Sequence, residues 1–452
     1  MKRRDFARVS GLAMAGAWTG ATPVLRDHRS DLGRGQAFVV DAPRLGERMR
    51  ELATFGANAA GGIDRVAFSD ANIEARDWVA GLLKTAGFET HTDFAGNLIA
   101  QKPGTELGLA PIMFGSHIDS VPGGGNFDGQ VGSMGAVEVA ATLADAGHMT
   151  RHPMEIAFFT NEEGGKTGSR ALAGQVERFE LDIETASGFT IGEGLDRLGG
   201  NAARLADVRR DEGSLTAFLE LHVEQGAVMD QDGIDIGVVE GIVGIMRWNV
   251  TVHGMTNHAG TTPMDRRADA MVGAARFITS AYRIAHDTPG RQVATVGRLE
   301  AEPGAPNVIP GRVGMTLEIR DLTMEGVADT YAAIEERSAE IARQTGVTFS
   351  FERFYTSGAA PTDLRIRDMV ERAANDLGLS PARMPSGAGH DAQSMALLCP
   401  VGMIFVPSVN GVSHAAEEHT ELKDIVNGSN VLLRTLLALD ADGLVTRQLP
   451  RP

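Results

Sequence analysis

Short apolar runs bounded by turn residues alternate with helical segments along the first half of the chain. Residues 111–115 and 154–160 are such runs, each of a length that suits one buried strand, and residues 131–146 between them are expected to be helical. Strand, helix and strand in this order are typical of a mostly parallel sheet with helices on its faces. We therefore predict an α/β fold with a mostly parallel central sheet.

The chain after residue 244 has a different organisation, and three glycines in the apolar run 237–244 suggest a hinge before it. The elements expected there are strands at 248–252, 293–299, 313–320 and 347–354 and helices at 267–283 and 324–345. Two βαβ-like halves on one sheet would form a compact α+β domain of roughly 110 residues. The expected organisation is a first domain in two parts, 36–244 and 356–452, with an inserted domain at 245–355.

The N-terminus has the features of an export signal. Arg3-Arg4 is followed by Phe6 and by a short apolar stretch that ends near Val24, a pattern that resembles a twin-arginine signal. The stretch is rich in glycine and alanine and too short for a membrane span of about 20 apolar residues. Residues 1–35 are therefore predicted to be a signal peptide that directs the protein to the periplasm. The alternative is a basic N-terminus on a cytoplasmic protein.

Composition excludes several kinds of partner and site. The formal net charge of −17 argues against a nucleic acid or an anionic membrane as partner. Cys399 is the one cysteine of the chain, so an internal disulfide and a cysteine-rich zinc site are both excluded. Any metal ion must then be held by histidine, aspartate and glutamate.

The stretch from Gly115 to Gly129 carries the first candidate metal ligands. His117 follows a predicted strand and Asp128 lies in a glycine-rich turn before a predicted helix. Ligands in open α/β sheets bind at the carboxyl ends of the strands, which is where both residues stand. Asp119 could orient the His117 imidazole. The alternative is a turn whose aspartate only caps the next helix.

Two adjacent carboxylates, Glu162 and Glu163, follow the next predicted strand. Adjacent carboxylates repel each other unless a cation neutralises one of them. A metal ion would do so and would leave the other carboxylate free to act as a general base toward water. The alternative is a pair of exposed acids that opens a loop.

Two further histidines occur in the same setting. His222 lies within the apolar strand 219–223, where core histidines also occur, and His414 follows the apolar strand 403–406. One histidine of this kind is weak evidence for a metal site. Its recurrence at equivalent strand ends, together with Asp128 and the carboxylate pair, is strong evidence.

Six motifs occur in one order along the chain: Gly115-Ser116-His117 to Asp128-Gly129, Asn161-Glu162-Glu163-Gly164, Glu220-Leu221-His222-Val223-Glu224-Gln225-Gly226, His258-Ala259-Gly260-Thr261-Thr262-Pro263-Met264, Pro306-Asn307-Val308-Ile309-Pro310-Gly311 and Ser386-Gly387-Ala388-Gly389-His390-Asp391-Ala392. This combination resembles the hydantoinase/carbamoylase family of amidohydrolases, which includes N-carbamoyl-L-amino-acid hydrolases, allantoate amidohydrolases and β-ureidopropionases. That family lies within the larger group of di-zinc enzymes related to aminoacylases and carboxypeptidases. The resemblance extends from about residue 40 to the C-terminus.

The resemblance implies two divalent metal ions per subunit, zinc in the first place, with manganese, cobalt or nickel as alternatives. Asp128 would bridge the two ions, and the further ligands would be His117 and His222 for one ion and Glu163 and His414 for the other.

The resemblance also implies a reaction, with Glu162 as the general base. The expected reaction is hydrolysis of a linear carbamoyl or ureido C–N bond in a small carboxylate substrate, such as an N-carbamoyl-L-amino acid or allantoate. A dipeptidase or N-acyl-amino-acid hydrolase of the same group is the alternative. A binding protein that has lost catalysis is the alternative of another class.

Substrate-binding residues are implied mainly in the inserted domain. Arg320 resembles the family's carboxylate-binding arginine, since a guanidinium matches a carboxylate with two parallel hydrogen bonds; a surface salt bridge beside Asp321 is the alternative. Asn307 would present its amide to the same substrate end, and Arg247 would be a further anion contact. In the wider group a histidine in this position, here His258, stabilises the oxyanion in the partner subunit's site, so a homodimer is implied. Weaker candidates for the pocket wall are Gln225, Gly389 and His390.

The chain departs from the family pattern at two places. The Glu-Glu-Gly motif often continues with Arg-Phe, whereas Gly164-Gly165-Lys166-Thr167 stands here, and the extra glycine could reshape the pocket. Ala415-Ala416-Glu417-Glu418 follows His414, where a proline is commoner.

Overall fold

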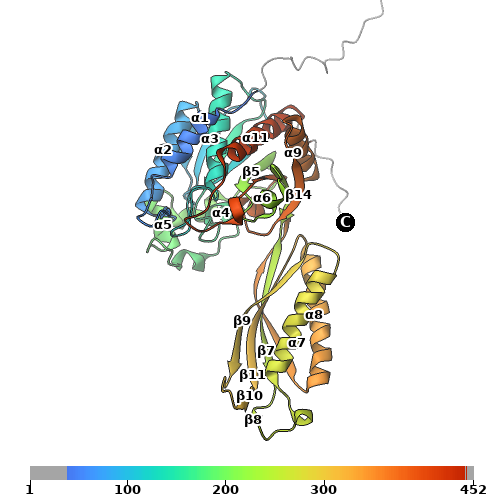
Figure 1. Cartoon of the computed structure of the whole chain (residues 1–452). Helices are drawn as coiled ribbons and strands as arrows, with labels where there is room; N and C mark the ends of the chain where they lie inside the picture. The colour runs from blue at the N-terminus through green and yellow to red at the C-terminus, as the bar shows by residue number, and fades with distance from the viewer. Residues whose placement is uncertain (1–37, 443, 445–452) are drawn as a thin grey trace, which may run out of the picture. The chain divides into compact units, whose positions relative to one another are not determined.

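The computed structural model describes residues 38–442 and residue 444, which belong to one compact unit that begins at Phe38. The predicted signal peptide, residues 1–35, lies outside the described residues. The described elements build two large sheets, each with its own helices, and one two-stranded sheet (Figure 1).

Within the described residues, nine strands form the larger sheet, in the order β1-β2-β4-β3-β5-β15-β6-β13, with β14 also paired to β6. Their bounds are β1 Glu89–Thr92, β2 Leu98–Lys102, β3 Ile112–His117, β4 Met154–Phe159, β5 Ala217–Val223, β6 Ile236–Ile242, β13 Ala360–Pro361, β14 Pro381–Ser386 and β15 Val401–Val406. The central strands β4, β3, β5 and β15 are parallel to one another, which confirms the predicted parallel core of the sheet. Their carboxyl ends therefore meet at one edge.

Helices cover both faces of this sheet. The helices and 3-10 helices of this part are α1 Ala42–Leu52, α2 Asp70–Thr85, α3 Gln130–Asp145, α4 Thr167–Leu172, η1 Arg178–Asp182, α5 Ile191–Arg197, η2 Ala202–Val208, α6 Val228–Asp232, α9 Leu364–Asp376, α10 Asp391–Met395, η4 Val409–Gly411 and α11 Leu422–Asp442. Helices α1, α2, α3, α9 and α11 share one core with the sheet, while α4 and α10 share the core on the other face.

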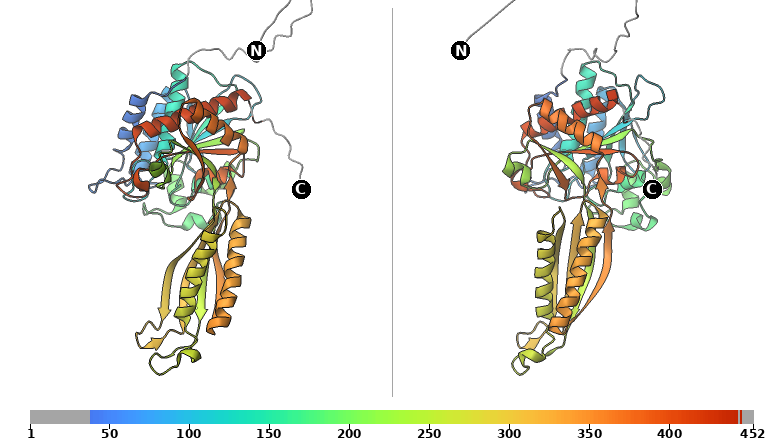
Figure 2. Two further views of the ribbon diagram at one scale, coloured as in Figure 1. Left: turned by 45° about the vertical axis from the view of Figure 1, so that its right-hand side comes forward. Right: turned by 90° about the vertical axis from the view of Figure 1, so that its right-hand side faces the viewer.

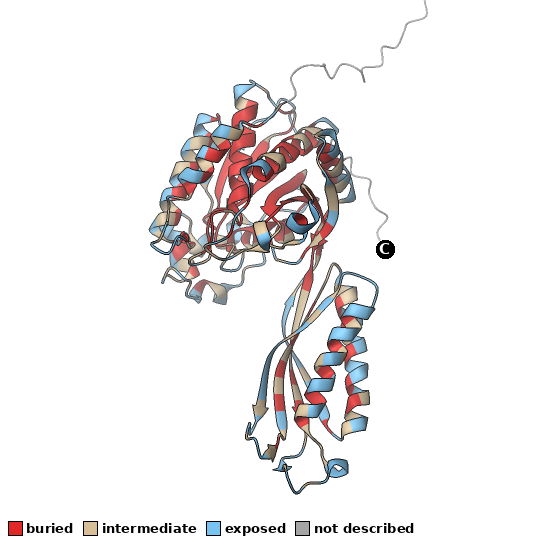
Figure 3. Ribbon diagram, in the orientation of Figure 1, coloured by how far each residue is buried: buried red, intermediate tan, exposed pale blue. Residues whose placement is uncertain are grey.

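Alternate side chains of the central strands enter the two cores. Phe114 and Phe158 belong to the first core, whereas their neighbours Met113 and Phe159 belong to the second. Because both faces are covered, these strands have continuous apolar sequences rather than alternating ones. The buried strands and the helices packed on them appear as the red centre of Figure 3.

Side-chain caps start the first two helices. Asp41 accepts a hydrogen bond from the Arg44 backbone N–H at 3.0 Å, and Ser69 accepts one from the Asn72 backbone N–H at 3.1 Å. These side chains satisfy donors that the first turn of a helix leaves unpaired. Helices α1 and α2 therefore begin directly after Asp41 and Ser69.

The second sheet lies in the inserted segment, residues 244–357. Its four strands in the described chain, β7 Gly244–His253, β9 Val293–Glu302, β11 Arg312–Asp321 and β12 Thr348–Ser357, are arranged in the antiparallel order β12-β7-β11-β9. Helices α7 Ala270–Asp287 and α8 Met324–Thr345 pack side by side on one face (Figure 2). β7-α7-β9 and β11-α8-β12 are two interleaved βαβ halves, as predicted.

The run 237–244 lies where the chain passes from the larger sheet to the second one. Most of it belongs to β6, which is buried in the central sheet, and Val243 alone separates β6 from β7. A Cβ on Gly237 would lie 2.8 Å from the Phe405 Cβ, so this glycine permits close packing against β15. Packing between neighbouring strands therefore explains Gly237, and the hinge expected in this run stays a prediction.

The far end of the inserted segment is closed by two short strands. These are β8 Asn257–His258 and β10 Val308–Ile309, which pair antiparallel, and the 3-10 helix η3 Met264–Arg266 follows β8.

Candidate metal centre and substrate site

The predicted metal ligands come together at the carboxyl edge of the central sheet. His117 is the last residue of β3 and His222 the last but one of β5. Glu163 lies in the turn after β4, and His414 lies in the loop after β15. Asp128 lies in the turn directly before α3. Four parallel strand ends thus bring distant residues into one cluster.

The Asp128 carboxylate lies between two groups of donor atoms. Its Oδ1 is 3.7 Å from His117 Nε2 and 3.2 Å from His222 Nε2, while its Oδ2 is 3.2 Å from His414 Nε2. Glu163 Oε2 lies 3.4 Å from the same His414 nitrogen. His117, Asp128 and His222 form one group of converging donors, and Asp128, Glu163 and His414 form a second. One carboxylate oxygen in each group is the arrangement that a bridge between two cations requires.

The charges of this cluster fit divalent cations. Burial and the nearby Asp128 and Glu162 carboxylates raise the pKa of Glu163 to about 11. Burial also raises the pKa of Glu162, although His117 opposes the shift. Carboxylates this crowded cannot all ionise without added positive charge. Divalent ions bound by imidazole nitrogens and carboxylate oxygens supply that charge, so the residues present fit them.

His222 supplies part of the positive charge that these carboxylates require. Burial alone would lower its pKa, but the Asp128 and Glu220 carboxylates and the Val223 carbonyl together outweigh burial and raise the pKa of His222 to about 9. Its Nδ1 lies 2.9 Å from the Val223 carbonyl oxygen, so Nδ1 donates and Nε2 faces Asp128. The ring is therefore oriented with Nε2 toward the cluster.

Asp119, which was expected to orient His117, contacts its ring through the backbone carbonyl rather than the carboxylate. His117 Nδ1 lies 3.1 Å from the Asp119 carbonyl oxygen but 3.9 Å from its Oδ1. The Asp119 carboxylate instead accepts a hydrogen bond from the Glu163 backbone N–H at 3.2 Å. Asp119 thus positions two candidate ligands, one with each of its acceptor groups.

Gln225 and His390, two weaker sequence candidates, both lie at the cluster. Gln225 Nε2 donates to Asp128 Oδ2 at 2.5 Å. The His390 ring packs edge-on against His222 with ring centroids 4.4 Å apart, and its Nε2 lies 2.8 Å from Ser386 Oγ. Burial lowers the pKa of His390 well below its ordinary value, so this imidazole is neutral.

Gly389 lies beside Lys166, a residue that the sequence flagged only as a departure from the family pattern. A Cβ at position 389 would be 2.7 Å from Lys166 Nζ, and this ammonium donates to Gln393 Oε1. The space next to Gly389 is thus filled by a cation from the loop after Glu163.

Glu418 organises two of the ligand loops, a role that sequence reasoning missed. This buried residue accepts hydrogen bonds at Oε1 from the backbone N–H groups of Phe127 at 2.9 Å and Asp128 at 2.8 Å. Its Oε2 accepts from Ser413 Oγ at 3.3 Å and from the His414 backbone N–H at 3.1 Å. Its only sequence signal is a spacing of four residues from His414.

Strained backbone also marks the site. Among the described residues, Asn161, Gln225 and His414 adopt left-handed conformations with φ of 54°, 59° and 57°. For residues other than glycine this conformation costs about 1–2 kcal/mol each. Such residues cluster at functional sites, where surrounding contacts hold them in place.

The arginines predicted to bind a carboxylate lie together where the inserted segment joins the central sheet. Arg247 on β7 is paired in register with Glu318 on β11, and the Arg247 Nε is 2.5 Å from Glu318 Oε2. Arg320 Nε is 2.7 Å from Glu318 Oε1, and Arg320 Nη1 donates to the Gly387 carbonyl. Glu318, which the sequence analysis did not single out, therefore holds both guanidinium groups. Arg320 thus forms a partly exposed salt bridge, as the alternative expected, and within the described residues its partner is Glu318 and not Asp321.

His258 and Asn307 lie at the opposite end of the inserted segment. His258 is paired with Val308, and the Asn307 carbonyl accepts the Ala259 backbone N–H at 3.0 Å. These strands adjoin the Arg312 end of β11, and eight residues of strand separate Arg312 from Arg320, about 26 Å at 3.3 Å per residue. Within one chain, therefore, Asn307 does not reach the substrate end that Arg320 would hold.

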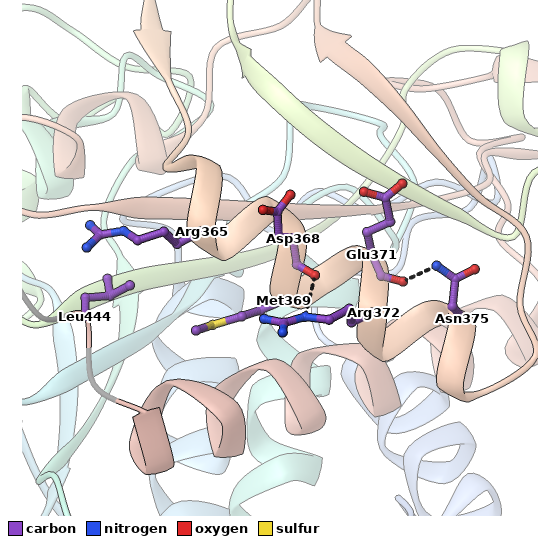
Figure 4. A pocket seen from close by; sticks show the side chains of 7 residues that line it. All are labelled: Arg365, Asp368, Met369, Glu371, Arg372, Asn375 and Leu444. Atoms are coloured by element: carbon purple, nitrogen blue, oxygen red, sulfur yellow. Dashed lines mark hydrogen bonds between the residues drawn. The ribbon is translucent and has the colours of Figure 1, made fainter.

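A separate surface hollow of about 550 Å³ lies over α9 (Figure 4). It is lined by Arg365, Asp368, Met369, Glu371, Arg372, Asn375 and Leu444. None of the candidate metal-binding groups found among the described residues includes one of these side chains. The metal cluster at the sheet edge is therefore the candidate functional site.

Comparison with known proteins identifies the family. A model of peptidase family M20/M25/M40 matches residues 113–438. The chain belongs to this family. Together with the two donor groups around Asp128, membership of this family indicates that the M20-family protein binds divalent metal.

Similar proteins narrow the relationship within the family. The N-carbamoyl-L-amino acid amidohydrolase of Geobacillus stearothermophilus is 38% identical over 406 residues, which cover 89% of this chain and 99% of that protein. The allantoate amidohydrolase of Escherichia coli (strain K12) is 31% identical over 399 residues, 87% of this chain and 97% of that protein.

A solved structure supports the same relationship. The crystal structure of a hydantoinase/carbamoylase family amidase from Burkholderia multivorans matches with a TM-score of 0.83 and 36% identity, over 90% of this chain and 100% of that one. The resemblance to the hydantoinase/carbamoylase family is therefore confirmed. In residues 38–442, no helix of this M20-family protein has both the length and the apolarity of a membrane span.

Proposed function

We propose that the protein is a metal-dependent amidohydrolase that cleaves a linear carbamoyl or ureido C–N bond in a small carboxylate substrate. The observation that carries this proposal is the buried Asp128 carboxylate, which has one oxygen in each of two donor groups. Similarity over nearly the whole chain to an N-carbamoyl-L-amino acid amidohydrolase and an allantoate amidohydrolase supports the substrate class.

We infer that two divalent ions occupy the cluster, one held by His117, Asp128 and His222 and the other by Asp128, Glu163 and His414. A set of imidazole and carboxylate donors favours zinc, with manganese, cobalt or nickel as alternatives. When bound, such ions polarise the substrate carbonyl and lower the pKa of water.

Glu162 is the proposed general base. Its Oε2 lies 3.8 Å from His117 Nε2, and its side chain is 10% exposed, yet it belongs to neither donor group around Asp128. A carboxylate beside the cluster but outside it can accept a proton from water and pass it to the leaving nitrogen. Burial raises the pKa of Glu162, which increases its basicity.

Arg320 is the proposed anchor for the substrate carboxylate, with Arg247 beside it. Glu318 binds the Nε edge of each guanidinium, and this fixes the direction in which the Nη atoms point. A guanidinium oriented in this way can bind a carboxylate through two parallel hydrogen bonds. Gln225, Gly389 and His390 would form the neighbouring wall.

We infer that His258 and Asn307 serve the site of a partner subunit. His258 Nδ1 accepts the backbone N–H groups of Gly260 at 3.0 Å and Thr261 at 3.2 Å, so Nε2 carries the proton and can donate to an oxyanion. These residues adjoin the Arg312 end of β11, and Arg320 lies about 26 Å further along the strand, so one active site can use both ends only if two chains contribute. A homodimer through the inserted segment follows.

We further propose export to the periplasm through Arg3-Arg4. Replacement of both arginines by lysine should leave the protein in the cytoplasmic fraction of expressing cells. Periplasmic recovery of that variant would contradict a twin-arginine signal.

The proposed function is tested with purified protein on N-carbamoyl-L-amino acids and allantoate, with elemental analysis of the bound metal. Glu162→Gln should keep the metal and lose turnover, because the carboxylate is the base and not a ligand. Metal-loaded protein that is inactive on every carbamoyl and ureido substrate would refute the proposal. Faster hydrolysis of dipeptides would favour the dipeptidase alternative.

A further inference from the structure

A cavity with several basic lining residues lies in the first domain, between α2 and the edge of the larger sheet. It encloses about 290 Å³, close to the lower end of the range for small-molecule pockets, about 300–1,000 Å³. One face of α2, strand β1, Leu98 of β2 and the last residue of α5 contribute to its walls. None of its lining residues belongs to a candidate metal-binding group of the described structure. The cavity is therefore a feature separate from the metal centre.

Arg76 is the buried cation of this cavity. The residue is 6% exposed, and burial lowers the pKa of Arg76 to about 10, which leaves the guanidinium protonated at neutral pH. Within the part of the chain that the structure describes, the side chain forms one hydrogen bond, from Nη2 to the Gly96 carbonyl, and no ion pair. A guanidinium has five N–H donors, so four of them are available to a group in the cavity.

Arg65, the other arginine buried within the described residues, shows what a purely structural buried arginine looks like in the same domain. Its guanidinium donates to the carbonyl oxygens of Ile118 at 2.6 Å, Leu52 at 2.8 Å and Phe55 at 3.0 Å, and to Asn126 Oδ1 at 2.9 Å. A buried charge without such partners is costly. The acceptors that Arg76 lacks are therefore expected from a group that enters the cavity.

The carboxylates near Arg76 do not supply these acceptors. Asp93 attracts Arg76 most strongly, but its own oxygens accept the backbone N–H groups of Ala95 and Asn97, both at 2.9 Å, and the Asn97 side-chain amide. Asp77 lines the cavity, but its side chain is exposed and forms no ion pair with Arg76 in the described structure. The guanidinium thus keeps donors that no neighbouring acid uses.

Other lining residues add donors on further sides of the cavity. Lys84 and His91 are exposed, and the hydroxyl groups of Thr90 and Thr92 form no hydrogen bond with any described residue. Arg197 also lines the cavity, but its guanidinium is already bound to Asp70.

The charge of the lining favours an anion. Arg76 and Lys84 are cations without an ion-pair partner among the described residues, and Asp77 is the one acid of the described lining. This local excess of positive charge occurs in a chain whose formal net charge is −17. Several donors together with positive charge suit a ligand that carries several anionic oxygens.

We propose that this cavity binds a phosphate-class oxyanion, either free phosphate or the phosphoryl group of a small phosphate ester. Arg76 would bind two phosphate oxygens through parallel N–H donors, and Lys84, Thr90 and Thr92 would bind the remaining ones. A carboxylate has only two oxygens and would leave some of these donors without an acceptor. The site is distinct from the proposed carboxylate anchor at Arg320 and does not depend on the proposed amidohydrolase function.

Hydrogen bonds connect this cavity to the loop that carries the proposed base. Arg76 donates to Gly96, and the next residue, Asn97, accepts the Thr160 backbone N–H at 3.0 Å and donates to the Gly168 carbonyl at 3.2 Å. Thr160 and Gly168 flank the loop 161–167. An anion bound to Arg76 therefore stabilises a turn that holds both ends of this loop.

The test is isothermal titration calorimetry of inorganic phosphate with the metal-loaded full-length protein, after removal of excess metal and at low ionic strength. Lys84→Glu should weaken phosphate binding about tenfold or more, because a charged donor is replaced by a group that repels the ligand. Lys423→Glu makes the same change of charge at an exposed position outside the cavity and should bind phosphate as the wild type does. Arg76→Gln should abolish binding, and if this variant does not fold, the exposed Lys84→Glu decides.

Binding of phosphate at the candidate active site is the competing outcome, and Arg320→Ala with metal-free protein separates the two sites. Phosphate binding that survives both changes but is weakened by Lys84→Glu would support the cavity. Binding that is lost in Arg320→Ala or without metal, and is unaffected by Lys84→Glu, would overturn the proposal.

Glycerol 3-phosphate is the second probe and distinguishes the two sources of the oxyanion. Tighter Lys84-dependent binding of this ester than of phosphate would support a phosphate ester as the occupant, and equal or weaker binding would support free phosphate. The absence of Lys84-dependent binding of both probes would refute a phosphate-class site.

Discussion

Replacement of Glu418 by glutamine tests how the metal centre is held together. The Glu418 carboxylate accepts four hydrogen bonds, two from the turn that carries Asp128 and two from the loop that carries His414. Glutamine has the same shape but only one acceptor oxygen, and its amide nitrogen can only donate. One of the two loops must then lose its acceptor.

The size of the effect follows from the bonds lost. If the remaining oxygen stays with the Phe127 and Asp128 backbone N–H groups, the new amide faces the His414 backbone N–H, and two donors meet. A buried donor left without a partner costs about 1–3 kcal/mol. Since about 1.4 kcal/mol corresponds to a factor of ten, the loss corresponds to roughly 10- to 100-fold in metal affinity. In other proteins, mutation of residues that hydrogen-bond to metal ligands lowers metal affinity by a factor of about the same size.

The assay is a zinc titration of metal-free protein against a chromophoric chelator, with thermal unfolding of the metal-free protein measured in parallel. Glu417→Gln is the matched control, because it removes the same charge one residue away from an exposed side chain. Glu417→Gln should bind zinc as the wild type does, whereas Glu418→Gln should bind it more weakly. Equal affinities for the two variants would show that Glu418 does not hold the His414 loop.

Three further changes follow from the same structure. Gly129→Ala should lower the bound metal measured by elemental analysis, because a Cβ there would lie 2.2 Å from His117 Nε2; wild-type metal content would contradict this. Arg320→Ala should raise KM for carboxylate substrates about 10- to 100-fold with less effect on kcat, and unchanged steady-state constants would contradict the carboxylate anchor. Burial raises the pKa of Glu318, but hydrogen bonds from Arg320 and Arg247 outweigh burial and lower it below 4.5. The ionised side chain therefore stabilises the folded state above pH 4.5, and this stabilisation is lost as the pH falls through the folded-state pKa. In denaturant unfolding without metal, the free energy of unfolding of Glu318→Gln should be about 0.5–1 kcal/mol below that of the wild type at neutral pH. This difference should vanish in acid.

Much of the metal centre could be predicted because local patterns fixed the position of each ligand. His117, Asp128, Glu163, His222 and His414 each lie in, or follow, an apolar strand or a glycine-rich turn. The carboxyl ends of parallel strands meet at one edge, so a ligand that ends one strand lies near a ligand that ends the next.

The partners of these ligands could not be predicted in the same way. Glu418 joins its own loop to the distant turn of Asp128, and Glu318, which holds the arginines, joins Arg320 of its own strand to Arg247 on β7. Nothing in the adjacent sequence distinguishes these two residues from exposed glutamates. Asp119 was expected to orient His117, but only the structure shows that its carbonyl oxygen is the nearer acceptor. The glycines at 237–244 suggested a hinge, and only the structure shows that Gly237 packs against β15.

By itself, the sequence determined the α/β architecture and indicated the candidate metal-binding residues, because strand and helix patterns and ligand types are local properties of the chain. The reaction class came from the resemblance to a known family. Tertiary structure alone decided which side chain holds which candidate ligand, since hydrogen bonds between distant segments depend on the register of the sheet and the path of the loops. It also placed His258 and Asn307 at the far end of β11 from Arg320 and left a cavity beside Glu163 between four segments of the chain. A cavity exists only where separate segments leave space between them, and no single segment of the sequence encodes that space.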